Sequence, residues 1–149
     1  MPVMGVSRFQ RFFRVVASLD VDENDLKRYD EFVNRKLYDL LVRGEANAKA
    51  NLRDVIAQHD LPITAGLQRS IQEFEHLDDE IELAPILDGL TRRPPLDLEY
   101  SIETEAGLPV IAGGISVALA HTIKTVEPAL EAPHSEHWER SFRIIDQLL

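Results

Sequence analysis

Apolar residues recur about every three or four positions along most of the chain, which is the spacing of one face of an α-helix. The first stripe predicts a short amphipathic helix that buries Phe9, Phe12, Phe13, Val16 and Leu19. Asp22 then stands in a capping position before a much longer helix, which is predicted to end near residue 51. After a loop at residues 51–54, a third helix is predicted from the stripe Ile63, Leu67, Ile71 and Phe74.

The same short, long and short order recurs in the second half of the chain. A short helix is predicted over residues 81–90, and Arg92-Arg93-Pro94-Pro95 forces a loop after it. A second long helix is predicted from about residue 97 to residue 126, with a kink or a break at Pro109, because proline lacks the helical N–H donor. The last helix is predicted to be capped by Ser135 and to bury Trp138, Phe142, Ile145 and Leu148.

This pattern predicts an all-α protein built from two helix–loop–long helix–loop–helix units, residues 1–76 and 77–149. A helix of about 28 residues is about 42 Å long and cannot bury its apolar stripe against its own neighbours alone. We therefore expect the two long helices to cross, so that residues 1–149 form a single compact domain. Gly113 or Gly114 is expected at the crossing, against residues 37–41 of the first long helix.

The composition is that of a folded protein that is stable by packing alone. Apolar residues make up 44% of the chain, which is enough to bury a core, and there is no cysteine. The lack of disulfides and thiolate metal sites favours a cytoplasmic protein, and no apolar run approaches the roughly 20 residues that cross a bilayer. Residues 1–19 contain no acid and would also suit a presequence or an interfacial helix, although a core-packing helix accounts for them.

The charge is unevenly distributed, which bears on the partners that the chain can bind. Residues 1–75 carry 11 Lys and Arg against 12 Asp and Glu, whereas residues 76–149 carry 5 against 14. A DNA-binding protein needs a basic face that displaces counterions from phosphates, so this acidic chain is not expected to coat DNA. The candidate nucleic-acid contacts all lie in the first half: Arg8, Arg11, Arg14, Lys27, Arg28 and Arg53.

The segment after the first long helix is similar to the second loop of archaeal histones. Arg53 is followed by Val55-Ile56 and, seven positions after the arginine, by Asp60-Leu61. The resemblance implies a histone fold, in which two helical units clasp head to tail, and an ion pair between Arg53 and Asp60 across the loop. Val55 stands where those histones have a threonine, which removes a hydroxyl group that could contact DNA.

Nearly the whole chain also resembles a small family of uncharacterised bacterial proteins with two histone folds in one polypeptide. The segments that carry this likeness are Gly5-Val6, Leu19-Asp20-Val21-Asp22, Asp60-Leu61-Pro62-Ile63-Thr64, Gly113-Gly114 and His137-Trp138-Glu139-Arg140. The resemblance implies an intramolecular histone-fold pseudo-dimer, related to archaeal histones. It implies a fold and brings no established activity with it.

The residues that could suggest a metal or catalytic site are better explained by structural roles. A metal site could be suggested by His134, Glu136, His137 and Glu139. Two of these, His137 and Glu139, are two positions apart and diverge on a helix. The acidic run at residues 78–82 is typical of a solvated turn beside a helix start, where the helix dipole favours acids, and Gly113-Gly114 lacks the spacing of a phosphate loop. We therefore expect no enzymatic activity, no metal and no cofactor.

Two classes of function remain open. In the first, the chain is a protein-interaction or assembly module that binds a protein partner or a second copy of itself. In the second, it is a DNA-binding, nucleoid-associated protein whose binding is weak because its basic residues lie in one half. No small-molecule substrate and no membrane association are expected.

Overall fold

The computed structural model describes residues 5–81, 96 and 98–149. Within these residues the chain is mostly helical, with one small sheet of two strands. The elements in chain order are α1 (Val6–Ala17), α2 (Glu23–Ala50), β1 (Val55–Ile56), η1 (Gln58–Asp60), α3 (Ala65–Ile81), β2 (Glu99–Tyr100), α5 (Ile102–Val126) and α6 (Ser135–Leu148). The predicted helix over residues 81–90, the predicted loop at residues 92–95 and the acidic side chains at residues 78–82 lie outside what the structure describes.

The bounds of the first long helix follow from its cap. The Asp22 side chain accepts from the Asp25 amide over 3.0 Å, and Asp25 accepts from the Asp22 amide over the same distance. This reciprocal capping box satisfies amides that the first turn leaves unpaired. The prediction of a 28-residue helix from Asp22 to about Asn51 is confirmed.

The third helix also begins at a side-chain cap. Thr64 Oγ1 accepts from the Leu67 amide over 3.1 Å, and α3 begins at the next residue, Ala65. The helix continues to Ile81, so the expected division between two units after residue 76 falls inside α3.

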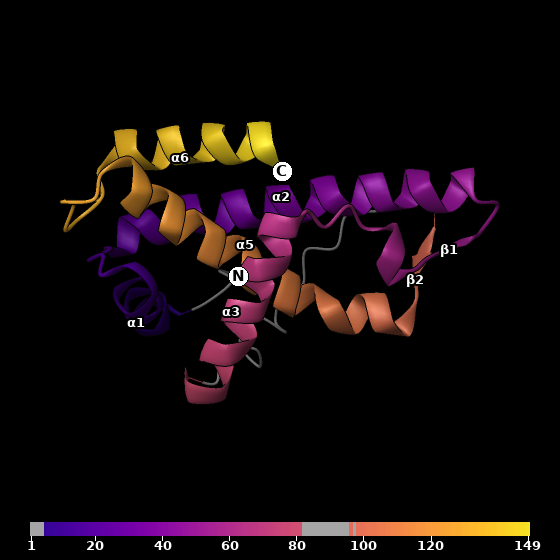
Figure 1. The fold of residues 1–149 in the computed structure, drawn as a ribbon, viewed down its shortest axis with the longest axis horizontal. Coiled ribbons are helices and arrows are strands. Elements are labelled where there is room, and N and C mark those ends of the chain that lie inside the picture. Colours follow the sequence, from indigo (N-terminus) through magenta and orange to yellow (C-terminus); the bar gives the residue numbers. More distant parts are fainter. Residues whose placement is uncertain (1–4, 82–95, 97) are drawn as a thin grey trace.

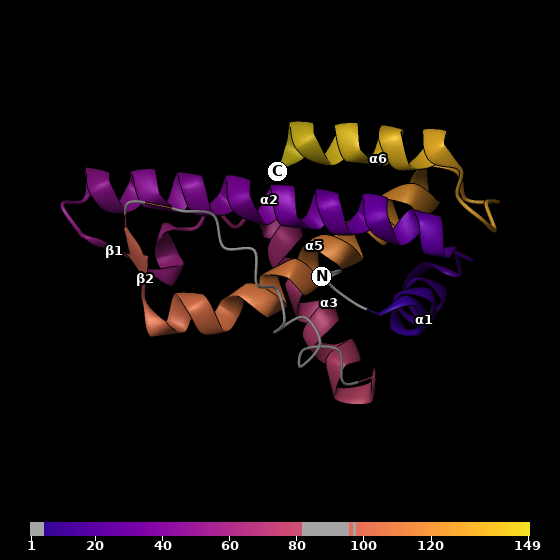
Figure 2. The same cartoon turned by 180° about the vertical axis from the view of Figure 1, so that it is seen from behind.

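The second long helix is continuous. It begins after Ser101, whose side chain accepts from the Thr104 amide, and ends at Val126, with Glu127 as its C-cap. A break at Pro109 is wrong, because α5 runs through that position, and its axis bends between its first turns and the remainder (Figures 1 and 2). Among the described helices, α5 alone is long and apolar enough to cross a membrane by length and composition, which corrects the prediction that no apolar run approaches that length. Its most apolar window is 67% buried inside the fold, as in a core helix.

The last helix begins one residue earlier than predicted, because its N-cap lies one residue before Ser135. His134 is the N-cap, and Ser135 is the first helical residue. Trp138 and Ile145 are buried as predicted, and Phe142 packs against the core. Leu148 is 72% exposed, so the prediction that it is buried is wrong.

An aromatic cluster joins the first helix to the last. Phe9 and Phe13 of α1 pack against Tyr29 of α2, and Phe13 also lies 5.5 Å from Trp138 of α6 between ring centroids. All four side chains are fully buried. Figure 1 shows α2 spanning most of the long axis, with α6 alongside it and α3 crossing α5.

Two pairs of loops close the fold, one at each end of α2. At one end, β1 and β2 pair in parallel, and the Ser101 amide donates to the Ile56 carbonyl over 2.9 Å. At the other end, the Asp20 amide donates to the Glu131 carbonyl over 2.7 Å, which joins the α1–α2 loop to the α5–α6 loop. Each pair joins a loop from the first half of the chain to a segment that flanks α5. The two halves are therefore clasped at both ends.

Candidate functional site

The loop between α2 and α3 holds a two-pronged ion pair. Arg53 donates from Nη1 to Oδ2 and from Nη2 to Oδ1 of Asp60, both over 2.5 Å. The Ala57 amide donates to the same carboxylate over 2.8 Å, and the Asn47 side chain donates to the Asp60 carbonyl over 2.7 Å. Asp60 is 2% exposed, so these donors replace the water that a buried carboxylate loses.

The electrostatics of this pair favour the charged form of both groups. Hydrogen bonds from Arg53 lower the pKa of the Asp60 carboxyl, and Asp60 in turn raises the pKa of Arg53. The guanidinium therefore commits a donor from each terminal nitrogen to the carboxylate of Asp60, the last residue of η1. In this geometry Arg53 holds the loop together.

The other candidate nucleic-acid contacts lie near the opposite end of α2. They are exposed or half-buried side chains of α1 and of the first turns of α2, namely Arg8, Arg11, Arg14, Lys27 and Arg28. Arg28 lies about 22 residues, or about 33 Å, before the end of α2, and Arg53 lies beyond that end. Arg14 also donates to Asp20 over 3.4 Å. The six residues therefore do not form one continuous surface.

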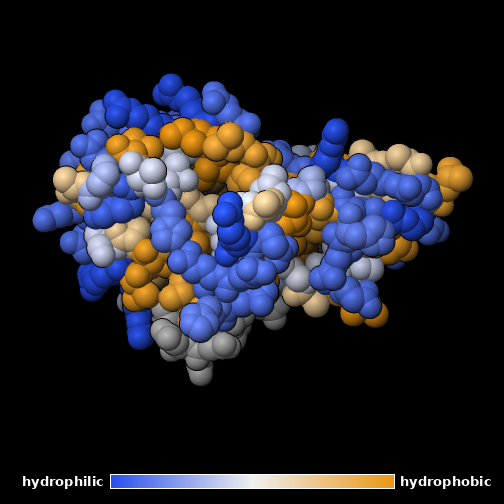
Figure 3. Space-filling view, in the orientation of Figure 1, coloured by the Kyte–Doolittle hydropathy of each residue, from blue (hydrophilic) through white to orange (hydrophobic). Residues whose placement is uncertain are grey.

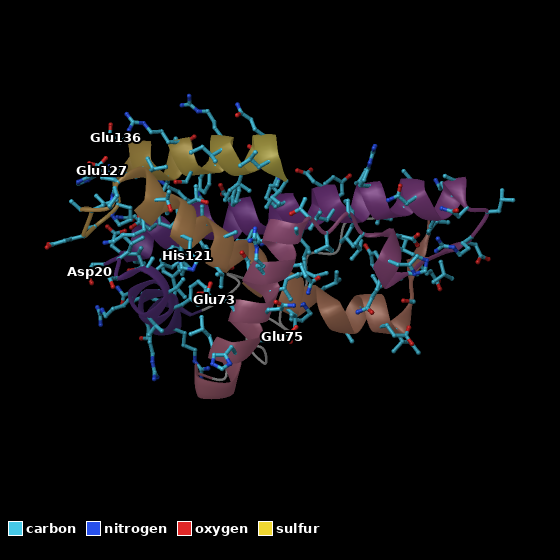
Figure 4. The ribbon with its side chains drawn as sticks, in the orientation of Figure 1. Asp20, Glu73, Glu75, His121, Glu127 and Glu136 are labelled. Carbon is cyan, nitrogen blue, oxygen red and sulfur yellow. The ribbon has the colours of Figure 1, made fainter. Side chains whose placement is uncertain are left out.

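Acidic side chains accompany both loop pairs. Figure 4 shows Asp20, Glu127 and Glu136 at the same end of the molecule, with Asp20 nearer α1 and the two glutamates nearer the start of α6. At the opposite pair, Asp54 and Glu99 are exposed. A phosphate backbone would meet negative charge at each end of the clasp, and the arginines of α1 lie close to one of these acidic ends.

Known proteins are similar to this chain along nearly its full length. The family profile described as a domain of unknown function (DUF1931) matches residues 9–146. The chain belongs to this family. An uncharacterised protein of Aquifex aeolicus (strain VF5) is 30% identical over 136 residues, which cover 83% of this chain and 79% of that protein. Another from the same organism is 24% identical over 144 residues, covering 97% and 84%.

Two crystal structures are similar to this DUF1931 protein along nearly its full length. A protein from Thermus thermophilus is 50% identical, with a TM-score of 0.89 and 99% of each chain covered. A protein from Aquifex aeolicus is 23% identical, with a TM-score of 0.85, covering 98% of this chain and 96% of the other. The second likeness concerns the fold alone. These similarities support a family and a fold, and no particular activity.

The glycine pair of the DUF1931 chain lies against α3, which corrects the prediction that it faces residues 37–41 of α2. A Cβ atom at Gly113 would overlap the ring of Phe74. At Gly114 it would overlap Ile71 Cγ1 and lie 3.1 Å from the Ile71 Cα and N atoms. The glycines do allow close helix packing, but the partner is the third helix of the first half. Spacing along one helix cannot identify which neighbour it meets.

A buried lysine that was not among the predicted site residues joins α2 to α6. Lys36 is 5% exposed, and its Nζ lies 3.2 Å from an oxygen of Asp146 and 3.5 Å from one of Asp39. Arg35 also donates to Asp146 over 3.2 Å. The i, i+3 spacing of Lys36 and Asp39 was a visible signal, whereas Asp146 is brought close only by the fold. These contacts fix α6 against the middle of α2.

A buried hydroxyl pair marks where the two long helices meet. Tyr29 of α2 and Ser116 of α5 lie 2.6 Å apart, and Ser116 donates to the Ala112 carbonyl over 2.7 Å. The Tyr29 hydroxyl therefore donates to Ser116. Burial raises the pKa of Tyr29, so the phenol stays protonated.

Removal of the Tyr29 hydroxyl and removal of the Ser116 hydroxyl are expected to lower the free energy of unfolding by different amounts. Tyr29→Phe leaves Ser116 bonded to Ala112 and should lower the free energy of unfolding by about 0.5–1.5 kcal/mol. Ser116→Ala leaves the buried Tyr29 hydroxyl without its acceptor and should cost about 1–3 kcal/mol. Urea unfolding of both variants gives the comparison. A larger loss for Tyr29→Phe would contradict the assigned direction of the bond.

The histidines near α6 take part in helix capping. The His134 amide donates to Nδ1 of the buried His137 over 2.8 Å. Glu136 and Glu139 are exposed on the first turns of the helix. Across the residues that the structure describes, no group of three or more potential ligands could hold a metal ion.

An apolar groove opens between the start of α3, the second half of α5 and the end of α6. Its volume is about 550 Å³, and its lining includes Ala65, Leu67, Ala118, Ile144 and Leu148. Figure 3 shows apolar surface over the end of α6 and the adjoining parts of α3 and α5. The exposed Leu148 belongs to the lining of this groove.

Proposed function

We propose that this DUF1931 protein is a non-enzymatic protein-interaction or assembly module, built as an intramolecular histone-fold pseudo-dimer. Two long helices, each followed by a loop and a shorter helix, support that architecture. The loop pairs at both ends of α2 support it further, because each joins one half of the chain to the other.

The observation that carries the interaction role is the charge of the two loop pairs. Asp20 and Glu127 accompany one pair, and Asp54 and Glu99 accompany the other. Wrapping a duplex requires cations on the surfaces that face the phosphates, because binding is driven by counterion release. Acidic groups at both ends oppose such binding. Arg53, the basic residue closest to the second pair, is bonded to Asp60.

A weak DNA-binding role is the second candidate, and one observation favours it. Arg8, Arg11 and Arg14 are exposed on one face of α1, which contains no acidic residue. With only about three phosphate contacts, the log–log dependence of affinity on salt would have a slope of roughly −2.7. A protein that wraps DNA makes many more contacts and has a steeper slope.

Duplex binding measured over a range of salt concentrations separates the two candidates. We expect no stable complex by fluorescence anisotropy near 0.15 M salt and at most a weak one in dilute buffer, where charges are less screened. The control replaces Arg8, Arg11 and Arg14 together with glutamine, which should leave the helical circular dichroism and the melting temperature unchanged. Tight binding by the native chain at 0.15 M salt that is lost in this variant would favour the DNA-binding role instead.

A further inference from the structure

Leu52 has a backbone conformation and a solvent exposure that both disfavour leucine. Its φ is 59°, in the left-handed region that favours glycine or asparagine. Its side chain is 96% exposed, so it gains nothing from burial within its own chain. Backbone strain of this kind persists where function requires it, and contact with a partner would account for the leucine.

Two other exposed apolar side chains share this end of the molecule. Ile102, the first residue of α5, is 84% exposed, and Val55 of β1 is also exposed. The pairing of β1 with β2 holds the two segments together. Leu52, Val55 and Ile102 together form the apolar tip of the molecule. Figure 3 shows apolar surface at the narrow end of the molecule, where the loop between α2 and β1 projects.

The apolar groove is a matching hollow that the tip of the same molecule cannot fill. Arg35 contacts Asp146 beside the end of α6, next to the groove. Leu52 lies just past the far end of α2, which continues about 15 residues, or about 22 Å, beyond Arg35. A tip can therefore enter a groove only on another molecule.

Charge complementarity points to the same pairing. Asp54 and Glu99 are exposed beside the tip. Arg69 and Arg143 are exposed, and each is next in sequence to a residue that lines the groove, Ser70 or Ile144. The acids near the groove are already engaged, because Asp146 binds Arg35 and Lys36, and Glu73 lies 2.7 Å from His121. The acidic side chains at the tip of a second molecule are thus attracted to these arginines.

We propose that the apolar tip of one molecule docks in the apolar groove of a second copy of this chain. The proposal rests on the interaction role proposed above and names its partner. Leu52 enters the apolar lining, while Asp54 and Glu99 face Arg69 and Arg143. Because tip and groove are different surfaces, the contact is heterologous, and each docked molecule keeps one free tip or one free groove. Repetition builds a ring or an open filament.

Two variants remove the two sides of this contact while favouring the fold of the monomer. Leu52→Gly suits the left-handed backbone and deletes the tip's main side chain. Gly66→Glu places an acid in the first turn of α3, where it suits the helix dipole, and no atom lies within 4 Å of the new Cβ. Its side chain obstructs the groove and repels the acidic tip. Val15→Gln, which removes an exposed apolar side chain from α1, is the matched control.

Sedimentation velocity from about 10 µM to about 1 mM tests the contact, because a small interface gives weak association. The native chain and Val15→Gln should associate as concentration rises, whereas Leu52→Gly and Gly66→Glu should each weaken association by about tenfold or more. An equal mixture of the two defective variants should recover a discrete 1:1 dimer, since one supplies the groove and the other the tip. An isologous interface does not predict that recovery.

A monomeric native chain over this range overturns the proposal, and so does association that Leu52→Gly leaves unchanged. Leu52-dependent flotation of a monomeric native chain with phosphatidylcholine vesicles would assign the tip to a lipid surface instead, which also overturns it. The duplex-binding result is independent of these outcomes. Failure of the docking contact is therefore distinguishable from failure of the proposed interaction role.

Discussion

Replacing Gly114 with leucine is expected to destabilise the protein by about 3 kcal/mol or more, at the upper end of overpacking effects. In a domain of this size, that loss corresponds to a fall in melting temperature of about 6–12 °C. The new side chain has no room to rotate away, because even a Cβ atom would meet both the Ile71 side chain and its backbone. The backbones of α3 and α5 would have to separate.

The matched control compares alanine at two helical glycines. Gly114→Ala should destabilise the protein, although alanine is a better helix former than glycine by about 1 kcal/mol. Gly66→Ala should be neutral or slightly stabilising, since no atom lies within 4 Å of its Cβ position. Thermal melts of the two alanine variants isolate the steric term. If both shift the melting temperature in the same direction, the close approach of α5 to Ile71 is not what determines stability.

The sequence predicted the elements that local interactions define. Asp22 was predicted to cap the first long helix, and its partner Asp25 lies three residues away in the chain. Thr64 caps α3 in the same way, through the Leu67 amide three residues later. Arg53 and Asp60 meet within one loop, across a seven-residue spacing that the sequence displays. In each case, the residues that determine the structure are neighbours in the chain.

Predictions failed where the answer depends on which elements meet in space. The glycine pair was correctly expected to allow close packing, but its partner is α3 rather than α2. The two-residue strands β1 and β2 have no periodicity of their own, because pairing between distant loops creates them. Burial of Lys36 depends on Asp146, 110 positions later in the chain. The exposure of Leu52 and Leu148 contradicts their hydrophobicity and is visible only in three dimensions.

The other large effect is expected at Asp60. Asp60→Ala removes both hydrogen bonds from Arg53 and the one from the Ala57 amide, within a buried loop. Hydrogen bonds to charged groups contribute about 1.5–3 kcal/mol each to stability, and Arg53 can turn to solvent after the change, so the net loss should fall near that range. The predicted fall in melting temperature at pH 7 is about 3–12 °C. Asp20→Ala, which removes the exposed partner of Arg14, should change the melting temperature little.

The dependence of this loss on pH identifies the carboxylate as its source. Because Arg53 lowers the pKa of Asp60 in the folded state, the unfolded state binds the proton more tightly. The pair's stabilisation is therefore complete above the unfolded pKa of about 3.9 and is lost as the pH falls through the lower folded pKa. The difference in unfolding free energy between the native chain and Asp60→Asn should thus be constant from pH 7 to about pH 5 and shrink below it. A difference that stays the same down to pH 2 would mean that packing of the loop, rather than the charged pair with Arg53, accounts for the loss.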